Sequence, residues 1–177
     1  MPFCAACGAA LAKSPPVACG SCGVEHWRNA KPCAGALVMR DGRLLLLRRA
    51  TEPYLGRWDI PGGFCEEDEH PALTARREAR EEVGLDVEIT GFLGLWLDRY
   101  ADPAEPERPW VTLNAYYHAT AHEGAEATPD PGEASEVGWF GPAGIPDGIA
   151  FPGHAPAVIA AWRDAVRAGR TVTALPD

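Results

Sequence analysis

Residues 63–85, GFCEEDEHPALTARREAREEVGL, form the stretch that decides the fold. Pro71 is a favourable first helical residue, no further proline or glycine interrupts the segment behind it, and Gly84 suits the end of a helix. The pattern therefore predicts a helix from Pro71 to Val83. Its small apolar residues recur at helical spacing and form one narrow stripe, made of Ala72, Ala75, Ala79 and Val83.

The same helix carries three closely spaced glutamates, Glu78, Glu81 and Glu82. Residues three and four positions apart share a helical face, so the carboxylates should project together and repel one another. A hard divalent cation such as Mg²⁺ or Mn²⁺ would relieve that repulsion. The charge pattern alone is also compatible with a solvated acidic face balanced by Arg77 and Arg80.

The full stretch resembles the Nudix box, G-x5-E-x7-R-E-U-x-E-E-x-G-U, in which U is a bulky aliphatic residue. The fixed polar and glycine positions all match, and Leu85 fills the last aliphatic place. The one departure is Ala79, where Ile, Leu or Val is usual, and Ala79 still belongs to the apolar stripe. The matching positions are Gly63, Glu69, Arg77, Glu78, Glu81, Glu82 and Gly84.

This resemblance implies that the chain hydrolyses a nucleoside diphosphate linked to another group, with Mg²⁺ or Mn²⁺ at the box. It makes Glu78, Glu81 and Glu82 metal ligands, with the carbonyl of Gly63 as a possible further one. Glu69 and Arg77 would then be structural, Arg77 holding the glutamates and Glu69 bracing the loop against the helix.

The box by itself does not identify the general base or the residues that contact the substrate. The base would be a box glutamate, Glu81 or Glu82, or a glutamate of the later loop, Glu133 or Glu136; the last two are equally compatible with solvated loop charges. Three arginines before the box could meet phosphates or simply lie on the surface: Arg48, Arg49 and Arg57.

The resemblance favours the ADP-ribose pyrophosphatase-like group. A zinc ribbon joined to a Nudix domain is also typical of NADH pyrophosphatases, but their S-Q-P-W-x-F-P element has no counterpart after Leu85. The alternatives are an NADH or oxidised nucleoside triphosphate pyrophosphatase and, from a different class, a non-catalytic nucleotide-sensing regulator. Dimers are common in the resembled group, and the sequence itself does not determine a homodimer.

The rest of the chain predicts strands around this helix. Residues 34–40 and 43–49 flank Asp41-Gly42 and indicate a β-hairpin. Further strands are expected within 58–63, 87–97, 111–121 and 137–140, a helix over 155–168, and Pro-rich acidic loops over 101–109 and 123–134. This order predicts an α+β fold, a Nudix α/β/α sandwich with a mixed sheet over 31–177.

Residues 1–30 predict a small zinc ribbon in front of that domain. Cys4-x-x-Cys7 and Cys19-x-x-Cys22, each followed by glycine, are separated by eleven residues and suit tetrahedral zinc. Because protein thiolates would fill all four positions, the Zn²⁺ should be structural. Disulfides or a redox centre are the alternative that this spacing favours less.

Composition limits the partners and the compartment. The 177 residues carry a net charge of −9, which opposes binding to nucleic acid or to anionic lipid. No apolar run is long enough to span a membrane, and no signal peptide is evident. We therefore expect a small-molecule nucleotide substrate, no nucleic-acid or membrane partner, and a cytoplasmic location, where thiols stay reduced.

Overall fold

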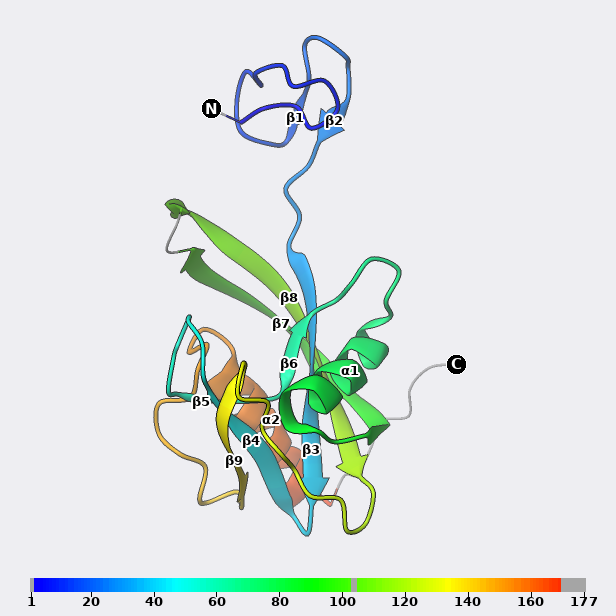
Figure 1. Ribbon diagram of the computed structural model, residues 1–177, viewed down its shortest axis with the longest axis vertical. Helices are drawn as coiled ribbons and strands as arrows, with labels where there is room; N and C mark the ends of the chain where they lie inside the picture. The colour runs from blue at the N-terminus through cyan, green and yellow to red at the C-terminus, as the bar shows by residue number, and fades with distance from the viewer. Residues whose placement is uncertain (1, 103–104, 170–177) are drawn as a thin grey trace. The chain divides into compact units, whose positions relative to one another are not determined.

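The computed structural model describes residues 2–102 and 105–169, and the chain divides into two compact units, Met1–Ala30 and Lys31–Asp177 (Figure 1). In the first unit, the short strands β1 (Val17–Ala18) and β2 (Glu25–His26) pair antiparallel. Its small core is made of Cys4, Leu11 and Cys19. An apolar core this small stabilises little by itself, as the sequence predicts for a unit that depends on metal.

The second unit is built on a mixed sheet whose path, within the described residues, runs β5-β4-β3-β8-β7. Strand β3 pairs parallel with β8 and antiparallel with β4, while β6 pairs with β3 and β9 with β4. The strands are β3 (Lys31–Arg40), β4 (Arg43–Arg49), β5 (Trp58–Asp59), β6 (Gly62–Phe64), β7 (Val87–Asp102), β8 (Glu105–Ala121) and β9 (Ala134–Phe140).

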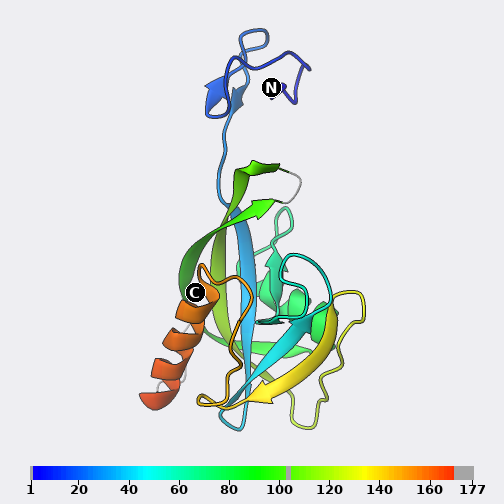
Figure 2. The same ribbon diagram turned by 90° about the vertical axis from the view of Figure 1, so that its left-hand side faces the viewer.

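One helix covers each face of this sheet (Figure 2). Helix α1 (Pro71–Val83) buries the predicted stripe, in which Ala75, Ala79 and Val83 are fully buried, against alternate residues of the central strands. Helix α2 (Ala155–Arg167) packs the fully buried Trp162 onto the other face. Because successive strand residues point to opposite faces, both faces of the sheet contribute to a core.

The ends of α1 follow the expected helix chemistry. His70 is the N-cap, and its Nδ1 accepts a hydrogen bond from the backbone N–H of Ala72 at 3.1 Å. Gly84 ends the helix in the left-handed conformation, with φ of 67°. The predicted hairpin turn is also confirmed, since Asp41 and Gly42 both have positive φ, at 51° and 71°.

The predicted loop over 101–109 is wrong for residues 101–102 and 105–109, and residues 103–104 lie outside the described part of the chain. Strand β7 continues to Asp102, and β8 begins at Glu105 and pairs with it. Backbone hydrogen bonds between two strands do not require apolar side chains, so composition underestimates such a hairpin. Pro106 and Pro109 fit in β8 because, among the described residues, β8 pairs with β3 only from Thr112 onward.

The layers confirm the predicted α+β class and the sandwich with a mixed sheet. The stretch 58–63, in which the sequence predicts one short strand broken by a Pro-Gly-Gly turn, instead enters two strands, with β5 on β4 and β6 on β3 on either side of Ile60-Pro61. In the described part of the chain, no helix is long and apolar enough to cross a membrane.

Candidate active site

A cleft of about 810 Å³ lies in the second unit between α1 and the carboxyl-terminal segments. Its walls come from β3, the stretch 49–60, β6 and the residues behind it, and α1. They also include the alternate residues Thr112, Asn114 and Tyr116 of β8 and the loops that carry Glu133 and His154. A volume of this size suits a nucleotide-sized ligand, since such sites span roughly 300–1,000 Å³.

Three carboxylates converge in this cleft, from Glu78, Glu82 and Glu133. One oxygen of each lies within 4.8 Å of the others. Glu78 and Glu82 are four residues apart on α1 and are 9% and 6% exposed, whereas Glu133 comes from the loop before β9 and is exposed. Hard oxygen donors in such a cluster fit a Mg²⁺ or Mn²⁺ ion.

The electrostatics of the cluster also fit a cation. Burial, together with the nearby acidic groups Asp59, Glu78 and Glu133, raises the pKa of Glu82 to about 9, although the backbone N–H of Gly62 donates to its Oε2 at 2.8 Å. Burial likewise raises the pKa of Glu78. A divalent cation bound among these carboxylates would offset the cost of burying their charge.

Arg77 connects the loop before α1 with two of the helix glutamates. Its Nε and Nη2 donate to the two oxygens of Glu69 at 2.9 and 3.0 Å, and its Nη1 donates to Glu78 and Glu81 at 2.8 Å each. The hydrogen bonds from Arg77 to Glu69 lower the pKa of Glu69 to about 2. Glu69 also accepts from the Thr74 hydroxyl at 2.7 Å, so the loop before α1 is joined to the helix at several points.

The structure brings together two of the three predicted helix ligands. Glu81 does not join the cluster, because its half-exposed carboxylate pairs with Arg77 instead. Glu133 completes the group in its place. Gly63 lies so close to the Glu78 carboxylate that a Cβ at this position would push that side chain aside, so glycine leaves Glu78 its place in the cluster.

The remaining candidates separate into cleft and surface residues. Glu136 does not line the cleft, since its carboxylate pairs with exposed Arg48 at 3.5 Å. Arg57 lies over the ring of Tyr54, also outside the cleft lining. Of the three arginines only Arg49 lines the cleft, and there it is bound to the buried carboxylate of Asp59 at 3.0 Å.

Sequence reasoning missed a group of three hydrogen-bonded polar side chains, two of which line the cleft. His154, at the start of α2, places Nδ1 2.8 Å from Asp98 Oδ2 and Nε2 2.8 Å from the Tyr116 hydroxyl. All three residues are at least nine-tenths buried. They belong to β7, β8 and the residue before α2, so no local pattern signals their contact.

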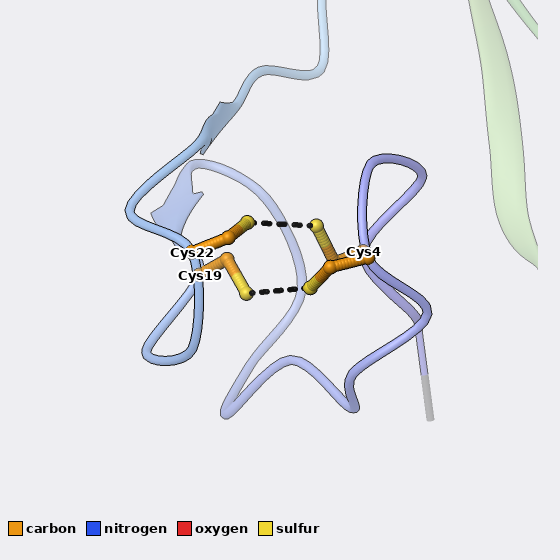
Figure 3. A group of neighbouring side chains, drawn as sticks. Cys4, Cys19 and Cys22 are labelled. Atoms are coloured by element: carbon orange, nitrogen blue, oxygen red, sulfur yellow. Dashed lines mark hydrogen bonds between the residues drawn. The ribbon is translucent and has the colours of Figure 1, made fainter.

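In the first unit, the four predicted cysteines form a second cluster, and their sulfurs lie within 4.8 Å of one another. The Cys4–Cys22 and Cys7–Cys19 sulfurs are 3.6 and 3.7 Å apart, and Figure 3 shows Cys4, Cys19 and Cys22 pointing toward one another. A tetrahedral zinc with bonds near 2.3 Å requires sulfurs about 3.8 Å apart, whereas disulfide sulfurs are about 2.05 Å apart. The arrangement fits Zn²⁺.

Two further features concern the sulfurs of this cluster. Backbone N–H groups of Cys22 and Ser21 lower the pKa of Cys19 to about 6, whereas the pKa values of Cys7 and Cys22 are raised, with contacts from neighbouring sulfurs among the causes. His26, which the spacing did not assign to this site, places Nε2 3.2 Å from the Cys4 sulfur. An imidazole hydrogen bond of this kind can orient a metal-bound thiolate from outside the four-sulfur set.

Comparison with known proteins gives consistent results. A family model described as the NUDIX domain matches residues 30–160. The chain is similar to the NAD-capped RNA hydrolase NudC of Stutzerimonas stutzeri, with 31% identity over 141 residues, which are 78% of this chain and 47% of that protein. It is also similar to an ADP-ribose pyrophosphatase of Methanocaldococcus jannaschii, with 33% identity over 67 residues, which are 38% of this chain and 40% of that protein.

Among solved structures, a NUDIX hydrolase from Nitrosomonas europaea superposes with a TM-score of 0.75 and 26% identity, covering 99% of this chain and 97% of that one. The chain spans about half the length, or less, of the curated relatives it matches. The substrates named for those relatives therefore indicate candidates to test on this chain.

Proposed function

The chain belongs to the NUDIX family, whose domain model covers residues 30–160, and we propose that it hydrolyses the diphosphate of nucleoside diphosphate derivatives with Mg²⁺ or Mn²⁺. The observation that carries the proposal is the convergence of Glu78, Glu82 and Glu133 in the cleft. We propose ADP-ribose-type compounds as the preferred substrates, supported by the likeness to an archaeal ADP-ribose pyrophosphatase.

The charges of the cleft explain why such a reaction would need a metal ion. Its described lining includes the arginines Arg49 and Arg77, and both are already bound to carboxylates. A diphosphate would therefore meet mainly acidic groups. A bound divalent cation would neutralise the diphosphate, polarise a phosphoryl oxygen and lower the pKa of the attacking water.

The chain's own residues would position the reactants. Glu78 and Glu82 would hold the metal, Gly62 would orient Glu82 through its backbone N–H, and Arg77 would orient Glu78. Glu133 stands at the exposed side of the cluster, where it would serve either as a further ligand or as the base that takes a proton from water. Glu81 accepts a hydrogen bond from Arg77 and would help to orient it, and it would reach the metal only if its side chain turned toward the cluster.

A second candidate substrate is the NAD(H) type of dinucleotide. The likeness to curated NAD-capped RNA hydrolases extends over most of this chain, which favours it. The missing S-Q-P-W-x-F-P element after Leu85 argues against NADH specificity. ADP-ribose and NADH both carry an adenylate joined through a diphosphate, so the same metal cluster would serve either compound.

The test is release of AMP or phosphate from a panel of ADP-ribose, NADH, FAD, dinucleoside polyphosphates and 8-oxo-dGTP, with Mg²⁺ or Mn²⁺. We expect ADP-ribose to be cleaved to AMP and ribose 5-phosphate by addition of one water. Glu82→Gln should abolish this cleavage, whereas Glu136→Gln is the matched surface control. No cleavage of any compound would overturn the proposal and favour a nucleotide sensor.

A further inference from the structure

Part of the cleft wall is formed by uncharged polar side chains of one strand. Thr112, Asn114 and Tyr116 alternate along β8, so they point to the same face of the sheet, and all three line the cleft. Each is less than a tenth exposed. Buried polar groups usually have every hydrogen-bonding atom satisfied, so the partners of these side chains are informative.

Asn114 has used both of its donors and keeps its acceptor. Its Nδ2 donates to the backbone oxygen of Trp96 at 3.2 Å and to Thr112 Oγ1 at 2.9 Å. Because a backbone carbonyl can only accept, this contact determines which end of the amide is nitrogen. Oδ1 accepts no hydrogen bond from the described residues, and the side chain lies at the cleft.

Tyr116 likewise presents lone pairs. His154 Nδ1 lies 2.8 Å from a carboxylate oxygen of Asp98, and its Nε2 shares one hydrogen bond with the Tyr116 hydroxyl, in which either group can donate. Burial raises the pKa of Tyr116 well above its ordinary value, so the phenol retains its own proton. In either direction this single contact leaves Oη with a further lone pair.

We propose that Asn114 Oδ1 and Tyr116 Oη form an acceptor subsite that binds an uncharged N–H or O–H donor of the substrate, away from its diphosphate. The inference rests on the proposed function for the identity of the substrate. In a nucleotide derivative, such donors are the exocyclic amine of the base and the sugar hydroxyls. A site whose buried acceptors are matched by substrate donors rejects analogues that lack them, because an acceptor is then left unpaired.

The test compares ADP-ribose with three analogues that each remove one donor: unsubstituted purine in place of adenine, a 2′-deoxyadenosine, and a deoxy form of the terminal ribose. Discrimination is the ratio of kcat/KM values with Mg²⁺, or the ratio of calorimetric Kd values for any ligand that is bound without being cleaved. The wild-type protein should discriminate against one analogue about tenfold. The analogue that loses affinity identifies which donor the subsite reads.

Asn114→Leu should reduce that discrimination to less than twofold, because the acceptor is gone. Leu113→Ala, on the same strand but on the opposite face and outside the cleft lining, should retain it. Equal discrimination in Asn114→Leu and wild type would overturn the inference. If Asn114→Leu does not fold, the wild-type series still decides, since binding of all three analogues within twofold of ADP-ribose would overturn it.

The outcome also separates the two proposals. Hydrolysis without donor discrimination would leave the proposed function intact and refute the subsite. Discrimination in Kd without hydrolysis would refute the proposed reaction and retain the subsite. A protein that neither binds nor cleaves these compounds would refute both.

Discussion

Replacing Glu82 by glutamine should stabilise the protein in the absence of a divalent cation while it removes the proposed activity. Glu82 is 6% exposed, and burial raises its pKa from an ordinary value of 4.5 to about 9. Glutamine has the same shape, is uncharged at every pH, and retains an oxygen that can accept from the Gly62 N–H. The variant therefore removes the cost of an unpaired buried carboxyl group without opening a cavity.

The size of the effect follows from the two pKa values. In the unfolded chain the side chain is ionised at pH 7, whereas the folded protein holds its proton, and each pH unit above 4.5 costs about 1.4 kcal/mol. At pH 7 the wild-type fold thus loses about 3 kcal/mol relative to acid conditions. For a protein of this size that corresponds to roughly 6–12 °C in Tm.

The sign of the pH dependence is defined by the raised pKa. The contribution of Glu82 to stability is fully present below pH 4.5 and is lost as pH rises toward 9. Thermal unfolding should therefore give similar Tm values for wild type and Glu82→Gln near pH 4.5, and a growing advantage for the variant up to pH 9. Added Mg²⁺ should narrow this gap, because it binds the wild-type carboxylates.

The measurement is circular dichroism or fluorescence melting between pH 4.5 and 9, with and without Mg²⁺. Glu136→Gln is the matched control, since its carboxylate is exposed and lies outside the cleft lining. A Glu82→Gln protein whose advantage over wild type does not increase with pH would refute the argument that burial holds the Glu82 proton.

Three further predictions concern individual side chains. Glu133→Gln should lower kcat by about 10²–10³, as expected for loss of a proton-transfer group, while Glu136→Gln stays within about twofold, which steady-state assays on ADP-ribose would show. Arg77→Lys should destabilise the fold by about 1–3 kcal/mol in denaturant titrations, because lysine cannot reproduce the two-point contact with Glu69. Cys4→Ser should reduce zinc content, measured by metal analysis, and unfold residues 1–30 while the melting transition of the larger unit persists.

Local pattern accounts for much of this protein. Helix α1 begins and ends where Pro71 and Gly84 predict, and the four cysteines meet as their duplicated spacing indicates. Such features depend on neighbours a few residues apart, so periodicity and turn chemistry reveal them. The same reasoning failed for residues 101–102 and 105–109, because their polar composition says nothing about backbone pairing with a partner strand.

In the candidate site, too, local spacing predicts some contacts and only the fold decides others. Glu78 and Glu82 are one helical turn apart, so sequence alone places them together. The sequence did not show whether Glu133 or Glu136 joins them. The fold brings Glu133 into the cleft, whereas Glu136 pairs with Arg48 outside the cleft lining. The sequence did not show which of Arg48, Arg49 and Arg57 lines the cleft, since an arginine that contacts phosphate and one that lies on the surface have the same local sequence pattern.

The sequence by itself determined the helix, its acidic face, the four-cysteine cluster and the family to which the chain belongs. Only the tertiary structure decided the polar wall formed by β8 and His154, where Asp98 and His154 meet across 56 positions and Asn114 Oδ1 accepts no hydrogen bond from the described residues. The physical reason is that helices and knuckles arise from local spacing, whereas this wall depends on the register of β8 against β7 and on where the chain returns to begin α2.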